Sequence, residues 1–141
     1  MARVFWDTNL FIYLFEENTE WAPSVIELRR RMLARRDDLL TSYLTVGEVI
    51  TKPKQMGNVM LERSYLNFFT SGTIELVGFS LDAAKRYGDI RSRQRVRPAD
   101  AIQLACAGAA RSDLFVTNDD RLSGLVVPGI TFVTGIDRVP Y

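Results

Sequence analysis

Short apolar runs alternate with longer segments of helical periodicity along the whole chain, and this alternation most constrains the fold. The runs rich in β-branched and aromatic residues predict five strands, at Arg3–Trp6, Leu39–Tyr43, Ile74–Phe79, Leu114–Val116 and Ile130–Val133. Strands that alternate with helices form a parallel sheet joined by right-handed crossovers, with helices on both faces. The sequence therefore predicts an α/β fold, a three-layer α/β/α sandwich with a central parallel sheet.

The helical segments are marked by apolar residues at three- and four-residue spacing. Four such sets occur: Trp21, Val25, Leu28 and Met32; Leu61, Tyr65, Phe68 and Phe69; Leu81, Ala84, Tyr87 and Ile90; and Ile102, Ala105, Cys106 and Ala109. We expect a break at Pro53 and Gly57 before the second set. Ser80 is a predicted cap for the third set, and Pro98 suits the first turn of the fourth.

Length and composition indicate a single domain spanning residues 1–141. The chain is 47% hydrophobic and 25% charged, which is typical of a folded globular protein. The start has no apolar signal core, and a lone cysteine, Cys106, excludes an internal disulfide. We therefore expect a cytoplasmic protein without a membrane span. The net charge of +1 gives no evidence for or against a nucleic-acid partner.

Four acidic residues stand at expected strand ends and helix starts, namely Asp7, Glu48, Asp100 and Asp119. The chain contains no histidine, which excludes Ser-His-Asp and Cys-His catalysis and argues against a zinc site. Four carboxylates at one point would repel each other unless a hard cation lay between them. If they converge, they predict a magnesium or manganese site.

Each of these acids also has a purely structural explanation. Asp7 could cap the helix that follows it, and Glu48 stands three residues after Thr45, which is the spacing of a capping box. Asp100 lies in a first helical turn, where the helix dipole favours a carboxylate, and Asp119 suits an Asx-turn. The combination is more informative, because a parallel sheet brings strand ends and the following helix starts to one rim.

The motifs around these acids resemble those of a known family. Asp7-Thr8-Asn9, Glu48, Pro98-Ala99-Asp100-Ala101 and Val116-Thr117-Asn118-Asp119 together resemble the acidic set of PIN-domain nucleases. The small size makes the chain most similar to VapC-type toxin ribonucleases of toxin–antitoxin pairs. The resemblance runs from Val4 to the final strand, and one departure is Leu122, where the family usually has an aromatic residue.

The resemblance implies a PIN-like sandwich that hydrolyses RNA phosphodiester bonds with one or two Mg²⁺ or Mn²⁺ ions and leaves 5′-phosphate ends. It also implies a homodimer and a small antitoxin partner. The implied catalytic and metal-binding residues are Asp7, Glu48, Asp100 and Asp119, supported by the polar residues Thr8, Asn9 and Thr117. Asp120 stays open as a ligand in place of Asp119.

Basic residues close to the acids are the expected substrate contacts. Arginine occupies every second position at Arg91, Arg93, Arg95 and Arg97, directly before Asp100. In an extended loop this spacing would place all four side chains on one side, where they could follow a phosphate backbone. Lys52 and Lys54 are further possible phosphate contacts near Glu48. The alternative is that these basic residues are only a solvated part of the surface and contact no substrate.

Two other functions stay open, a housekeeping RNA-processing PIN nuclease and a non-catalytic PIN-like module that binds RNA or protein. Two further protein classes are excluded because this chain lacks a residue that each of them needs. A receiver domain needs an aspartate at the end of its third strand, where this chain has Gly78-Phe79. A phosphatase of the Asp-x-Asp type needs an aspartate where Asn9 stands.

Overall fold

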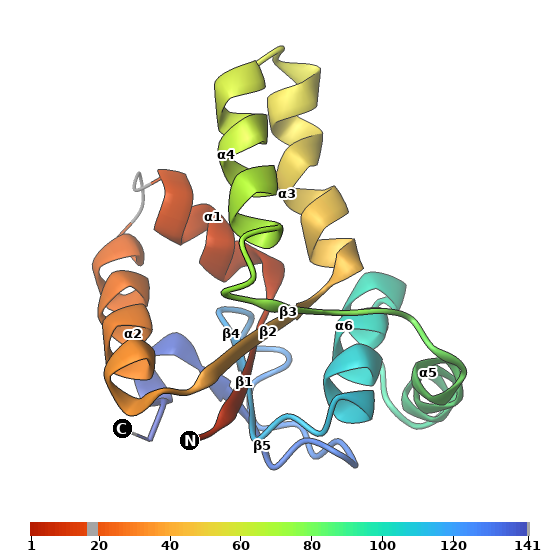
Figure 1. The fold of residues 1–141 in the computed structure, drawn as a ribbon. Helices are drawn as coiled ribbons and strands as arrows, with labels where there is room; N and C mark the ends of the chain where they lie inside the picture. Colours follow the sequence, from red (N-terminus) through yellow and green to blue (C-terminus); the bar gives the residue numbers. More distant parts are fainter. Residues whose placement is uncertain (17–19, 141) are drawn as a thin grey trace.

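The computed structural model describes residues 1–16 and 20–140 and forms a three-layer α/β/α sandwich (Figure 1). The elements are β1 (Arg3–Trp6), α1 (Thr8–Glu16), α2 (Ala22–Arg35), β2 (Asp38–Ser42), α3 (Tyr43–Gln55), α4 (Val59–Phe69), β3 (Glu75–Val77), α5 (Leu81–Arg93), α6 (Pro98–Ala109), β4 (Leu114–Thr117), β5 (Phe132–Gly135) and a 3₁₀ helix, η1 (Ile136–Arg138). This architecture confirms the predicted fold class.

The central sheet has five parallel strands in the order β3-β2-β1-β4-β5. All five predicted strands are present, with ends that differ by a few residues. Tyr43 was expected to end β2 but begins α3, and Ile130 precedes β5. Strands β2 and β3 lie on one side of β1, and β4 and β5 lie on the other. The strand order therefore reverses between β1 and β4, which is where ligands bind in open α/β sheets.

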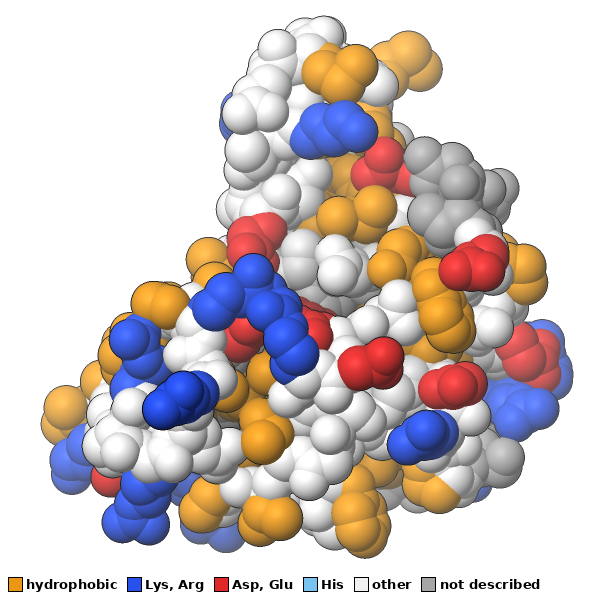
Figure 2. Space-filling view, turned by 180° about the vertical axis from the view of Figure 1, so that it is seen from behind, with side chains coloured by type: hydrophobic (Ala, Val, Ile, Leu, Met, Phe, Trp, Pro, Cys, Tyr) orange, Lys and Arg blue, Asp and Glu red, His pale blue; other side chains and the backbone are white. Residues whose placement is uncertain are grey.

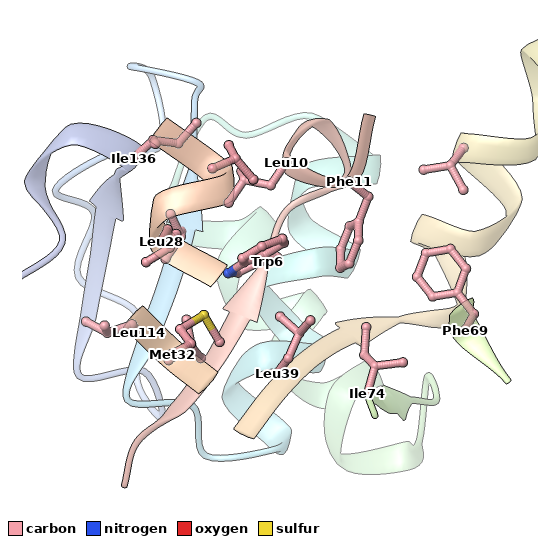
Figure 3. Packing of buried hydrophobic residues seen from close by; sticks show 14 of the residues in the cluster. Trp6, Leu10, Phe11, Leu28, Met32, Leu39, Phe69, Ile74, Leu114 and Ile136 are labelled. Carbon is pink, nitrogen blue, oxygen red and sulfur yellow. The ribbon is translucent and has the colours of Figure 1, made fainter. Parts of the chain in front are cut away.

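Alternate residues of the strands point to opposite faces and build two separate cores. Val4 and Trp6 of β1 belong to a cluster with residues of α1, α2, α3 and α4. Figure 3 shows Trp6 between Leu28 of α2 and Phe11 of α1, and the Trp6 and Phe11 ring centroids are 5.2 Å apart. Phe5 belongs instead to the second cluster, with α5 and α6. Both faces of the sheet are therefore covered.

The starts of α5 and α6 follow the sequence signals, whereas the break expected within α3 does not. The Ser80 side chain accepts a hydrogen bond from the backbone N–H of Ala83 at the start of α5, and Pro98 is the first residue of α6. The break expected at Pro53 is wrong, because Pro53 lies inside α3 on its buried face, where packing offsets the lost backbone hydrogen bond. The chain turns instead at Gly57, whose φ of +66° favours glycine.

Helices α3 and α4 form a hairpin that extends away from the sheet (Figure 1). Lys54 of α3 and Glu62 of α4 form an ion pair of 2.8 Å across this hairpin. Helix α3 starts directly after β2, so its first turns lie beside the carboxyl ends of the strands. Among the helices in the described ranges, none has the length and apolar character needed to cross a bilayer.

Candidate active site

All four predicted acids line one pocket at the carboxyl ends of the strands. Asp7 directly follows β1, and Asp119 lies two residues beyond the end of β4. Because these strands are neighbours, the backbone N–H of Asp7 donates to the carbonyl oxygen of Val116 at 3.0 Å. The pairing of β1 with β4 therefore brings two acids that are distant in sequence to the same end of the sheet and the same pocket.

Helices supply the other two acids. Asp100 lies in the first turn of α6, as expected. Glu48 does not open a helix as predicted, because α3 begins five residues earlier, at Tyr43. The alternative of a capping box is excluded, because Ser42 is the N-cap of α3 and the buried Thr45 hydroxyl bonds to Thr41 and Gln103. The Glu48 carboxylate instead accepts a hydrogen bond of 2.5 Å from the Thr8 hydroxyl.

Asp7 is the most buried of the four acids, with 9% of its surface exposed. Its carboxylate accepts hydrogen bonds from the Thr117 hydroxyl at 2.8 Å and from the backbone N–H of Thr8 at 2.9 Å. Burial raises the pKa of Asp7 to about 6, aided by the charges of Asp100 and Glu48 and opposed by these two hydrogen bonds. A cation in the pocket would relieve this unfavourable burial of charge.

Two arginines of the chain itself pair with acids of the pocket, and Arg97 also lines it. Arg121 donates two hydrogen bonds to Asp119, at 2.6 and 3.0 Å, and these lower the pKa of Asp119. Arg97 donates to Asp100 at 3.2 Å, and one of its nitrogens lies 3.7 Å from Asp119. Figure 2 shows basic side chains lying across acidic ones near the middle of one face.

The four carboxylates consequently share a pocket without meeting at one point. Within residues 1–16 and 20–140, no three acidic or cysteine side chains are already assembled as ligands of one ion. The four acids are therefore gathered as the lining of one pocket, without a ready-made group of three ligands in the described ranges. Asp119 and Asp100 are drawn to guanidinium groups, and Glu48 to Thr8.

The polar residues predicted beside the acids also lie at the pocket. Thr8 and Asn9 line it, and the buried Thr117 hydroxyl contacts Asp7 and accepts the backbone N–H of Asp119. Asp119 lines the pocket, whereas the exposed Asp120 is not among its lining residues. Leu122, which stands at the family's aromatic position, is buried in the second core cluster.

The predicted row of arginines is only partly correct. Arg91 and Arg93 belong to the last turn of α5, so the extended loop expected over residues 91–97 is wrong for its first half. The Arg91 guanidinium lies 5.9 Å from the centre of the Tyr87 ring, and Arg93 lines a separate cavity beside α5. Arg95 is exposed in the connecting loop, and Arg97 alone of the four lines the acidic pocket. Helical geometry turns these side chains in different directions.

Lys52 and Lys54 both lie in the last part of α3. Lys52 is four residues beyond Glu48, which places both on the same face of the helix. Lys54 points to Glu62 of α4 in the ion pair across the hairpin. Only Lys52 is therefore positioned along the helix face that carries a pocket acid.

A buried polar network beneath the pocket was missed by the sequence analysis. Gln103 is 2% exposed and forms hydrogen bonds to Ser42, Thr45 and Thr8. One signal was available, since Gln103 is an isolated amide in the apolar stretch from Ala101 to Ala107 of α6. A buried amide needs several partners, and these come from three other parts of the chain.

Comparison with known proteins places these features in context. Residues 4–126 match the family model described as PIN domain. No match to a protein with a curated function was found. Similar solved structures include VapBC2 from Rickettsia felis bound to a fragment of promoter DNA, with a TM-score of 0.73, 18% identity, and coverage of 94% of this chain and 97% of that chain.

Two further structures have comparable similarity. DNA-bound VapBC from Salmonella typhimurium gives a TM-score of 0.67 at 23% identity and covers 96% of this chain and 99% of its own. VapC20 from Mycobacterium tuberculosis, described as a sarcin–ricin loop cleaving toxin, gives 0.63 at 15% identity, with 79% and 86% covered. At these identities the structural similarity establishes the fold, and the acidic pocket lies where that fold places its strand ends.

Proposed function

The chain belongs to the PIN domain family, and on that premise we propose that it is a metal-dependent endoribonuclease and the toxin of a toxin–antitoxin pair. The observation that carries the proposal is the single pocket lined by Asp7, Glu48, Asp100 and Asp119. Its side chains offer oxygen donors, which suit magnesium or manganese better than zinc. The raised pKa of Asp7 supports the same conclusion, because an adjacent cation would stabilise the ionised carboxylate.

The four acids would hold one or two Mg²⁺ or Mn²⁺ ions. When bound, such an ion neutralises charge on a phosphodiester and lowers the pKa of a bound water. Asp120 stays a lesser alternative to Asp119, because its side chain is exposed and outside the pocket lining.

The chain's own residues prepare the pocket for this chemistry. Thr117 and the Thr8 backbone hold the Asp7 carboxylate in place, and the Thr8 hydroxyl holds Glu48. Asn9 lines the pocket and is available to orient a phosphate or a water. No histidine is present to transfer a proton, so this role falls to a carboxylate of the pocket.

Substrate binding is assigned to basic residues around the pocket. Arg97 is the leading contact for an RNA phosphate, because it lines the pocket and its side chain is largely exposed. Lys52 and Arg95 are exposed secondary contacts, while Arg91, Arg93 and Lys54 are less favourably placed. The similar VapC20 is a sarcin–ricin loop cleaving toxin, which makes structured RNA a reasonable first substrate.

As a toxin, the protein would bind a small antitoxin, form a homodimer and act in the cytoplasm. The toxin assignment is supported by the similarity to VapBC proteins and to a toxin–antitoxin complex from Klebsiella pneumoniae. A housekeeping RNA-processing nuclease would use the same pocket. A non-catalytic PIN-like module is disfavoured because all four acids are present. Co-purification with the product of an adjacent short gene would separate a toxin from a housekeeping enzyme.

The test is cleavage of a structured RNA by the purified protein in Mg²⁺ or Mn²⁺. We expect products with 5′-phosphate ends, and we expect EDTA or Asp7→Asn to abolish cleavage. Asp89→Asn is the matched control, because Asp89 is an exposed carboxylate of α5 outside the pocket. Cleavage that persists in both EDTA and Asp7→Asn would reject the metal-dependent mechanism.

A further inference from the structure

We propose that Gln103 is a positioning residue that directs the Thr8 hydroxyl towards Glu48 and so fixes one side of the acidic pocket. The role of this contact in metal binding rests on the proposed function. The orientation of Thr8 by Gln103 can be tested without a metal. Gln103 was not among the residues implied by the family resemblance. It lies in α6, one turn after Asp100.

All the hydrogen-bonding atoms of the Gln103 side chain have partners. Its amide nitrogen donates to the hydroxyl of Thr45 at 2.7 Å and to the hydroxyl of Thr8 at 3.0 Å. Its carbonyl oxygen accepts a hydrogen bond from the Ser42 hydroxyl. One side chain of α6 therefore connects α1, α3 and the end of β2 beneath the pocket.

The direction of the hydrogen bonds follows from the number of protons available. An amide nitrogen carries two protons, and here they serve Thr45 and Thr8. A threonine hydroxyl has only one proton. The Glu48 carboxylate, 2.5 Å from the Thr8 oxygen, can only accept, so the Thr8 proton goes to Glu48 and the lone pairs of the Thr8 oxygen serve Gln103. Gln103 thus occupies an acceptor position of the Thr8 hydroxyl, whose oxygen also lies 3.2 Å from the Thr45 hydroxyl. These two contacts hold the hydroxyl in the orientation that presents its proton to Glu48.

Thr8 transmits this constraint to two of the acids. Its hydroxyl donates to Glu48, and its backbone N–H donates to Asp7 at 2.9 Å. Glu48 is itself exposed at the surface of α3, so the bond from Thr8 is what restrains its carboxylate. Loss of Gln103 would remove one of three contacts that orient the Thr8 hydroxyl, leaving the longer one to Thr45 at 3.2 Å and the bond to Glu48 itself. The restraint on Glu48 would then be weaker.

The competing explanation is that Gln103 only satisfies buried hydroxyl groups and stabilises the fold. A purely structural role predicts a lower free energy of unfolding with unchanged behaviour of Thr8 and Glu48. Ser112 provides a matched comparison, since its buried hydroxyl donates to the Ala107 carbonyl at 2.9 Å. It lies just before β4, at the opposite end of the strand from the pocket.

The experiment compares Gln103→Met, Thr8→Val, Thr8→Ser and Ser112→Ala by two measurements. The first is the χ1 rotamer of residue 8 in the metal-free protein, from NMR scalar couplings. The second is the affinity for Mn²⁺, measured without RNA by electron paramagnetic resonance. In Gln103→Met we expect the Thr8 side chain to populate more than one χ1 rotamer, so that its scalar couplings take averaged values. We also expect Gln103→Met and Thr8→Val each to weaken Mn²⁺ binding by about tenfold, the lower end of the range for outer partners of metal ligands.

The remaining variants make the result specific. Thr8→Ser retains the hydroxyl and should bind Mn²⁺ like the wild type, and Ser112→Ala should lower stability without changing either measurement. A Thr8 rotamer that stays fixed in Gln103→Met would overturn the positioning role. If Gln103→Met does not fold, Thr8→Val decides, and wild-type Mn²⁺ affinity in that variant would also overturn it. A wild-type protein that binds no Mn²⁺, with Thr8 still released by Gln103→Met, would reject the proposed function and keep the positioning role.

Discussion

The Thr117 hydroxyl donates a hydrogen bond of 2.8 Å to the Asp7 carboxylate, although the two residues are 110 positions apart in the sequence. The same hydroxyl oxygen accepts the backbone N–H of Asp119 at 3.0 Å. One buried side chain at the end of β4 thus sets the positions of two acids. Parallel pairing of β1 and β4 brings Thr117 and Asp7 together. The sheet topology therefore determines how this part of the pocket is built.

The burial of Asp7 predicts that Asp7→Asn stabilises the metal-free protein above neutral pH. The pKa of Asp7 is raised to about 6 from an ordinary 3.8, so folding favours the protonated carboxyl. This contribution to stability is fully present below about pH 4 and is lost as the pH rises through 6. We expect the free energy of unfolding of Asp7→Asn to exceed that of the wild type by about 3 kcal/mol at pH 8, an order-of-magnitude value from the size of the shift.

Urea unfolding in EDTA between pH 4 and 8 measures this difference. It should shrink towards zero near pH 4, because the wild-type carboxyl is then neutral in the folded state. Asp89→Asn, on the exposed face of α5, should show no such trend. A variant that is less stable than the wild type at pH 8 would show that the Asp7 carboxylate is well accommodated without a metal.

The pairing of Arg121 with Asp119 predicts that this arginine competes with a metal for the same oxygens. Its guanidinium donates to both carboxylate oxygens, at 3.0 and 2.6 Å. Arg121→Ala should therefore bind Mn²⁺ more tightly, by about two- to fivefold, since exposed ion pairs are weak. Arg30→Ala is the control, because Arg30 pairs with Glu27 in a similar way on α2, away from the pocket. Equal affinities of the two variants would show that Arg121 does not restrain Asp119.

The thiol of Cys106 should be nearly inert in the folded protein. It is 1% exposed, and burial raises its pKa to about 11. The thiolate is the reactive form, so at pH 8 this shift alone slows alkylation by about 100-fold, and limited access slows it further. Iodoacetamide labelling followed by mass spectrometry, with and without guanidinium chloride, provides the measurement. Rapid labelling of the folded protein would mean that α6 opens readily.

The strand positions could be predicted because each strand is a short apolar run with clear boundaries. Arg3–Trp6 is correct to the residue, and the acids at the strand ends follow from the parallel order. Local signals were less reliable where a tertiary contact prevailed. Pro53 continues α3 because its face is buried, and Thr45 joins a buried network in place of a helix cap.

The details of the pocket depended on side-chain partners that no local pattern specifies. The period of two in the arginine row predicted an extended loop, yet Arg91 and Arg93 complete the amphipathic helix α5. The pairing of Arg121 with Asp119 and the role of Gln103 both arise from contacts across the fold. Such contacts are invisible to the spacing of residues along one segment.

The α3–α4 hairpin permits a last prediction, that two neighbouring lysines differ in their contribution to RNA binding. Lys52 lies one helical turn from Glu48, on the face of α3 that approaches the pocket. Lys54 is held by Glu62 at 2.8 Å and serves the hairpin. Lys52→Ala should therefore weaken RNA binding by about two- to fivefold and reduce its salt dependence by about one phosphate contact. Lys54→Ala should leave the affinity unchanged and lower the free energy of unfolding by less than about 1 kcal/mol.

Fluorescence anisotropy with a labelled RNA hairpin, at several salt concentrations, separates the two lysines. Both substitutions are made in the Asp7→Asn background so that cleavage does not disturb the equilibrium. The two variants have the same net charge, so a general electrostatic effect would weaken both equally and reduce both salt slopes. Equal losses would therefore contradict a specific contact at Lys52, whereas a loss confined to Lys52→Ala would place the RNA along the face of α3 that carries Glu48.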